Sequence, residues 1–181
     1  MRIITLCLLV LASASCLLGN VQSSAPQSVG FEEVQPFGFG DILKTILTTV
    51  RGVNCTMKQV IEVMAATTRY IDAIDACGTA VPKDIAKIIK SCLNIYDICN
   101  DIIHLNSTIC AHEEGAKMTG LKCTGELFLA IMKLTRNINV ALKLMAKLPF
   151  DTEECFVDAT RVVEASYKDF MPNVQLCVHD M

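Results

Sequence analysis

The chain has 181 residues, of which 52% are hydrophobic and 19% are charged, and its formal net charge is −3. This composition excludes a disordered chain, and the length suits one domain with a substantial core. Acidic and basic residues are interspersed and Trp is absent, so nothing recommends nucleic acid or another polyanion as a partner, or stacking on carbohydrate.

The first 23 residues are typical of a secretory leader, because Arg2 precedes a long apolar run. Small residues at the −3 and −1 positions fit cleavage after Ala14 or after Ser23. The later cut also removes Cys16 and leaves eight cysteines, an even number that suits an oxidising compartment. We therefore predict a signal peptide over residues 1–23 and a secreted, extracellular protein. Beyond the leader no apolar run could span a bilayer, so no stable membrane anchor is expected.

Residues 24–40 mix Ser, Pro and Gly without periodicity, which predicts a flexible lead-in. Near its end, Phe37 and Phe39 alternate with glycines and are expected to plug an apolar site on the folded domain. A helical, disulfide-rich domain is predicted over residues 41–181.

Two helices are expected in the first part of this domain. Asp41 can cap the first, and Gly52 then weakens or bends it, which gives a short helix or an extended first turn of the next. The second spans Cys55–Cys77 and stops at Gly78. Its apolar residues follow the steps of four and three that mark one face of a helix: Val60, Met64, Thr67, Ile71 and Ile74.

The third helix is expected to start at Pro82, a residue well suited to a first turn. Its predicted buried stripe consists of Ile85, Ile88, Ile89, Cys92, Tyr96, Cys99 and Ile103. The polar run 106–108 interrupts this pattern, and Gly115 and Gly120 keep the following residues irregular. These signals predict a turn after the third helix.

The last two helices have the most regular patterns. The earlier one ends at Pro149, and its apolar residues are Leu127, Ile131, Leu134, Ile138, Ala141, Met145 and Leu148. Asp151 and Glu154 form a capping signature for the final helix, whose predicted inner face is Phe156, Thr160, Val163, Tyr167 and Phe170. Pro172 is expected to break or kink that helix before Cys177. Successive helices with short connections predict an all-α, disulfide-stapled antiparallel bundle of four to five helices.

Two matching stretches frame the bundle. Cys55 and Cys77 lie 22 residues apart, as do Cys155 and Cys177. This separation is about six helical turns, so both sulfurs of each stretch leave from nearly the same side of a helix. Two such helices lying antiparallel could be joined at both ends, which predicts the bridges Cys77–Cys155 and Cys55–Cys177.

The four middle cysteines allow more than one arrangement. They can nest as Cys99–Cys110 and Cys92–Cys123, although Cys110–Cys123 is also feasible. Zinc sites need cysteine pairs two to four residues apart, and the nearest two here have six residues between them. Disulfides are therefore favoured over a metal site.

The sequence contains no motif for a reaction or for phosphate binding. His104 and His112 could meet Glu113 and Glu114 at a metal ion if the helix continued through them, but a solvated surface is the better interpretation; the third histidine is His179. We predict no catalytic residues, no enzymatic activity and no cofactor.

Two segments match the acceptor pattern for N-linked glycans, Asn54-Cys55-Thr56 and Asn106-Ser107-Thr108. Asn106 is the better candidate because it lies in the predicted turn. The segment at Asn54 contains a predicted bridge cysteine and could fold before it is modified.

A basic stripe on the fourth helix allows two interpretations. Lys133, Arg136, Lys143 and Lys147 lie opposite a Leu, Ile and Met face, which fits a helix lying on a membrane or a bundle helix with a solvated back. We favour the bundle. Eight Met and many Ile could also line a cavity for greasy ligands, although an ordinary core is the simpler interpretation.

The framing stretches resemble those of insect secreted proteins that carry the tsetse EP-type domain, a small extracellular helical module rich in cysteine. The similar residues are Cys55, Tyr70, Cys77, Cys155, Ala159, Phe170, Cys177 and Val178. The resemblance covers residues 55–178 and implies an extracellular location without an established enzymatic activity. Insect odorant-binding proteins fit less well, because they place three residues between their second and third cysteines and no such spacing occurs here.

These patterns favour a secreted, non-enzymatic helical protein that acts by surface interaction in an extracellular fluid. The partner would be an unidentified extracellular protein or an apolar ligand. The alternative is a carrier that holds small hydrophobic ligands in the bundle core.

Overall fold

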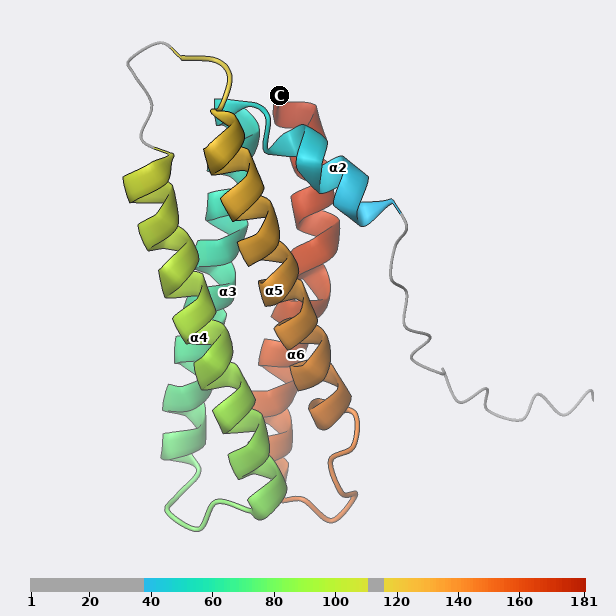
Figure 1. The fold of residues 1–181 in the computed structure, drawn as a ribbon. Helices are drawn as coiled ribbons and strands as arrows, with labels where there is room; N and C mark the ends of the chain where they lie inside the picture. The colour runs from blue at the N-terminus through green and yellow to red at the C-terminus, as the bar shows by residue number, and fades with distance from the viewer. Residues whose placement is uncertain (1–37, 111–115) are drawn as a thin grey trace, which may run out of the picture. The chain divides into compact units, whose positions relative to one another are not determined.

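The computed structural model describes residues 38–110 and 116–181. Within these ranges the chain forms five α-helices and a short 3-10 helix, and no strand (Figure 1). The elements are α2 (Phe39–Ile46), α3 (Val50–Ala76), α4 (Lys83–Ile109), α5 (Leu121–Met145), α6 (Glu154–Leu176) and η1 (Cys177–Asp180). The predicted all-α, disulfide-stapled bundle of four to five helices is confirmed. No helix in the described ranges is long and apolar enough to cross a membrane.

The four long helices run up and down in chain order and form the bundle (Figure 1). The helix α4 packs closely against α5, and α3 packs against both α4 and α6. The seam between α5 and α6 is the loosest of the four. At one end of the bundle α2 lies against α5, α6 and η1, so this short helix completes the core where the seam is weakest.

The short helix α2 exists because one of its faces is strongly apolar. Phe39, Leu43 and Ile46 lie on that face and are buried. Burial of Phe39 agrees with the predicted apolar plug, whereas Phe37 lies outside the described residues. The helix starts at Phe39 after Gly38, so Asp41 lies in its first turn and is not the predicted cap.

The junction between α2 and α3 is a tight turn capped by a side chain. The Thr49 hydroxyl accepts a hydrogen bond from the Gly52 amide at 3.0 Å, which starts α3 at Val50. Gly52 is buried against the end of α2, because a Cβ added there would overlap the Ile46 carbonyl oxygen. The glycine therefore permits a close backbone contact between two separate helices.

The inner faces of α5 and α6 agree best with the sequence-based expectation. All five predicted positions of α6 are buried, as are the predicted positions of α5 up to Met145. In α4 the buried face includes Ile95, Ile98 and Ile102, whereas Tyr96 is 39% exposed and was wrongly predicted to be buried. Apolar residues stand at both 95 and 96, so packing against the neighbouring helices decides which side chain is buried.

Three predicted helix ends were wrong. The helix α4 continues through residues 106–108 to Ile109, because the hydroxyls of Ser107 and Thr108 bond to the His104 carbonyl without interrupting the helix. Glu153 precedes α6, and Asp151 makes no capping bond. Pro172 lies inside α6 on its exposed side, where the ring causes no break before Cys177.

Candidate functional site

Two disulfides clamp α3 against α6 at both ends of the bundle. Cys55 is bonded to Cys177 and Cys77 to Cys155, with Cα atoms 5.7 and 5.8 Å apart. Both pairs are those predicted from the matching spacing of 22 residues. Because the clamped helices come from the start and the end of the domain, these bridges hold the bundle closed.

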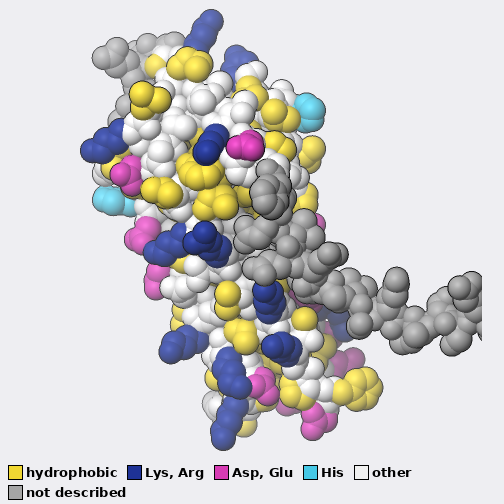
Figure 2. All heavy atoms as spheres, turned by 45° about the vertical axis from the view of Figure 1, so that its right-hand side comes forward, with side chains coloured by type: hydrophobic (Ala, Val, Ile, Leu, Met, Phe, Trp, Pro, Cys, Tyr) yellow, Lys and Arg dark blue, Asp and Glu magenta, His cyan; other side chains and the backbone are white. Residues whose placement is uncertain are grey.

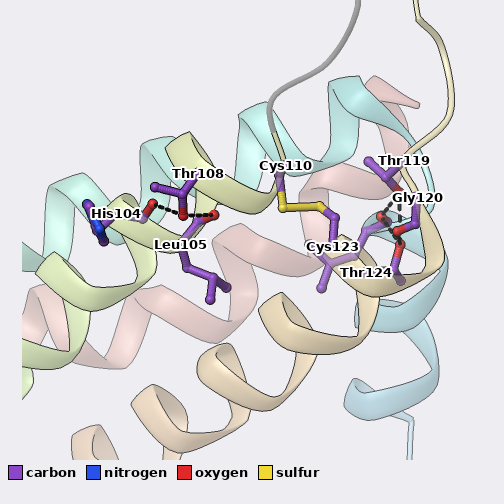
Figure 3. The surroundings of a disulfide bond; sticks show 9 residues. His104, Leu105, Thr108, Cys110, Thr119, Gly120, Cys123 and Thr124 are labelled. Atoms are coloured by element: carbon purple, nitrogen blue, oxygen red, sulfur yellow. Dashed lines mark hydrogen bonds between the residues drawn. A yellow bond between two sulfur atoms is a disulfide. The ribbon is translucent and has the colours of Figure 1, made fainter.

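The third disulfide joins the end of α4 to the first turn of α5. Cys110 and Cys123 have Cα atoms 5.1 Å apart (Figure 3). The favoured pairings Cys99–Cys110 and Cys92–Cys123 were therefore wrong, and the alternative Cys110–Cys123 is present. Only 13 residues separate the two cysteines in the sequence, and the start of α5 lies beside the end of α4, so the two sulfurs can meet.

Cys92 and Cys99 are unpaired in the structure and fully buried in the core. They lie seven residues apart on the same helix, a rise of about 10.5 Å. This exceeds the Cα separation of roughly 7 Å that a disulfide tolerates, so the two thiols cannot bridge each other. Burial raises the pKa of Cys92 to about 11 and that of Cys99 to about 12, which keeps both thiols protonated and poorly reactive at neutral pH.

A layer of buried hydroxyls lies between α3 and α6. The Thr67 hydroxyl donates to the Val63 carbonyl, so the Tyr167 hydroxyl donates to Thr67, at 2.8 Å. A longer contact of 3.5 Å joins the hydroxyls of Tyr70 and Thr160. Burial raises the pKa of Tyr70 to about 12 and raises that of Tyr167 further. These partners satisfy polar groups that would otherwise weaken the core.

The predicted histidines do not form a site in the described part of the chain. His104 and His179 are both exposed, and His112 lies outside the described residues with Glu113 and Glu114. Within residues 38–110 and 116–181, no group of three His, Cys, Asp or Glu side chains could hold a metal ion.

The two glycan acceptor segments both lie in helices. Asn54 is exposed near the start of α3, and Asn106 is half-buried in the last turns of α4. The predicted turn at Asn106 was wrong, so the reason for preferring this residue no longer applies. Asn54 is the more accessible of the two.

Two open hollows lie at the end of the bundle near the C-terminus. One has a volume of about 460 Å³ and is lined by Thr49, Val50, Arg51, Ala116, Lys117, Met118 and Met181. The other, of about 370 Å³, shares Arg51 with the first and also contains Lys58 and Asp180. Both are surface features, distinct from the apolar core that the carrier hypothesis requires.

The exposed side of α5 and the turn that follows it carry a row of positive charge, here called the cationic face: Lys133, Arg136 and Lys143 on the helix and Lys147 in the turn, with Leu129 and Val140 in the same row. All six side chains are exposed. The Leu, Ile and Met side of α5 lies in the bundle core, so it is not available to lie on a membrane.

No protein-family model, curated protein or solved structure matches the chain.

Proposed function

We propose that this is a secreted, non-enzymatic protein that acts by surface interaction in an extracellular fluid. Three disulfides support this location, because such bonds persist in oxidising compartments. The predicted signal peptide over residues 1–23 supports it independently. The resemblance to the tsetse EP-type domain family stays a prediction.

The cationic face is the observation on which the surface interaction rests. Three of its four cations lie on a helix whose inner face is buried in the core and whose first turn is held by the Cys110–Cys123 bridge, so these side chains project from an ordered base. A rigid, charged surface loses little backbone entropy when a partner binds. Electrostatic attraction also increases the rate of encounter with a partner of opposite charge.

The test has two parts. Production of the full chain in secreting eukaryotic cells should deliver it to the medium, and intact mass before and after reduction should report the leader cut, the bridges and any glycan on Asn54 or Asn106. In extracellular fluid, the labelled protein should then sediment as a larger complex than in buffer. Substitution of Lys143→Glu with Lys147→Glu should abolish this shift, whereas Arg161→Glu with Lys168→Glu on α6 should preserve it.

A carrier of small hydrophobic ligands in the bundle core is the second candidate. The loose seam between α5 and α6, closed by α2, is the observation that favours it, because displacement of α2 would open a path to the core. Saturable binding of a fluorescent fatty acid, reversed by an unlabelled one, would support this function. Absence of binding at micromolar protein would reject it.

A further inference from the structure

Positive charge is concentrated in one stretch of the chain. From Leu127 to Leu148 the chain carries four cations and no carboxylate. Lys133, Arg136 and Lys143 are spaced by three and seven residues and lie on the solvent side of α5, and the exposed Lys147 follows in the turn after Met145. The three helical cations extend over about 15 Å of helix. In Figure 2, Lys and Arg side chains (dark blue) follow one another down the lower part of the molecule.

The neighbouring helix extends this positive surface at the Lys143 end, whereas at the Lys133 end it carries the exposed Asp97. The Asn94 side-chain amide on α4 donates to the Asn137 side-chain oxygen on α5 at 2.7 Å, which shows where the two outer faces meet. Because the helices run antiparallel, α4 residues before Asn94 lie alongside α5 residues after Asn137. The exposed Lys83 and Lys90 therefore accompany the half of the cationic face that contains Lys143 and Lys147.

The cations of this face are not neutralised by ion pairs within the described residues. The three ion pairs found there lie within α4 or within α6: Lys87–Asp84, Arg161–Asp158 and Lys168–Glu164. On α6 each cation is thus matched by a carboxylate one turn away. The four cations of the cationic face are exposed to water and repel one another, and binding of an anion would relieve this repulsion.

We propose that the cationic face, with Lys83 and Lys90 beside it, binds a sulfated polysaccharide chain. This inference rests on the proposed function and names the chemistry of its partner. A linear chain with regularly spaced sulfates matches a row of lysines and an arginine along a rigid helix, and it requires no aromatic stacking. Charges are interspersed over the chain as a whole, which had argued against a polyanion, but this stretch carries cations alone and the fold exposes them on one side.

The same surface fits other anionic partners less well. Leu129 and Val140 are 65% and 53% exposed, but they are isolated among the charges and offer little apolar area to the centre of a protein interface or to a membrane. Binding by charge alone suits a sulfated polymer, and it makes affinity strongly dependent on salt because bound counterions are released.

The test measures binding of a heparin oligosaccharide of defined length by titration calorimetry between 50 and about 300 mM salt. The wild-type chain should bind with an affinity that falls steadily with salt. Lys143→Gln with Lys147→Gln should weaken binding about tenfold or more and reduce the slope of log affinity against log salt by about two. The control pair Arg161→Gln with Lys168→Gln should change both values little, and circular dichroism should confirm that all variants fold.

Several results would overturn the proposal. Equal weakening by the control pair would mean that charge anywhere on the protein suffices. Equal binding of desulfated heparin would remove the role of sulfate, and binding to vesicles of acidic phospholipid but not to heparin would assign the face to membranes. Absence of heparin binding, with the sedimentation shift in extracellular fluid retained, would reject the polysaccharide and leave the proposed surface interaction standing. Loss of both would reject the two proposals together.

Discussion

The hydroxyl of Tyr167 on α6 lies 2.8 Å from that of Thr67 on α3, in the buried space between the two helices that the disulfides clamp. One hundred residues separate the two partners in the sequence. The bond therefore helps to fix the relative rotation of α3 and α6, which bridges at the helix ends control less directly. Its donor is Tyr167, since Thr67 gives its own proton to the Val63 carbonyl.

Replacement of Tyr167 by Phe tests this bond. The change removes one buried hydroxyl while the ring keeps its place, and Thr67 retains its bond to Val63. We expect the free energy of unfolding to fall by about 1 kcal/mol, the usual net value of one hydrogen bond. Urea unfolding followed by circular dichroism measures it. Tyr96→Phe, at an exposed position of α4, is the matched control and should change stability by less than about 0.5 kcal/mol. Equal effects of the two substitutions would show that the buried bond contributes nothing.

The two buried thiols give a prediction about covalent structure. A chain that begins after Ser23 should contain three disulfides and two free thiols, on Cys92 and Cys99. Without reductant, an alkylating reagent should modify neither thiol in the folded protein and both in denaturant, because burial protects them and raises their pKa. Intact mass and peptide mapping count the labels. A denatured, unreduced chain that takes up no label would mean that these cysteines are paired.

Stability should decrease at high pH. In the folded state burial raises the pKa of Cys92 to about 11, that of Cys99 to about 12 and that of Tyr70 to about 12, whereas the ordinary pKa is 9.0 for Cys and 10.0 for Tyr. The folded protein thus keeps protons that the unfolded chain releases. Their contribution to stability is complete below about pH 8 and is lost as pH rises toward 12, at up to about 1.4 kcal/mol per pH unit for each group.

Denaturant unfolding at pH 8, 9 and 10, with short incubation to limit disulfide exchange, measures this loss. Cys92→Ala with Cys99→Ala removes both thiols from this set of groups and should flatten the dependence above pH 9, although the cavities lower stability at every pH. A variant that keeps the wild-type slope would show that other groups cause the alkaline loss.

The apolar pattern was sufficient to predict the buried face of a helix where one face is clearly the more apolar, even when the helices packed against it are distant in the sequence. In α6, Phe156, Val163 and Phe170 recur at steps of seven and Tyr167 falls between the last two on the same side, so one face carries the aromatic residues and is the one buried. The spacing of Cys55, Cys77, Cys155 and Cys177 worked for the same reason, since two equal separations on antiparallel helices leave one arrangement that joins both ends.

The pairing of the four middle cysteines could not be predicted in this way. The sequence pattern gives the height of each residue along the bundle axis, but it does not give the direction in which the side chain points. Cys92 and Cys123 were placed by level alone, and a disulfide also needs Cα atoms within about 7 Å. The polar run 106–108 predicted a turn, but Ser and Thr side chains can bond to the preceding helical turn. The cationic face was visible in the sequence as a stripe; its exposure and its lack of ion pairs among the described residues were not.

Gly52 gives the sharpest test of the junction between α2 and α3. A Cβ at this position would overlap the Ile46 carbonyl oxygen and approach the Ile46 carbon to 2.9 Å. Because the obstacle is backbone, the contact can be relieved only by separating the two helices. We expect Gly52→Ala to lower the free energy of unfolding by about 2 to 3 kcal/mol, despite the higher helix propensity of Ala. Gly125→Ala on α5 is the control, since no atom lies within 4 Å of its added Cβ, and it should stabilise the protein by up to about 1 kcal/mol. If both substitutions were stabilising in thermal or urea unfolding, the close approach of α2 to α3 would not exist in solution.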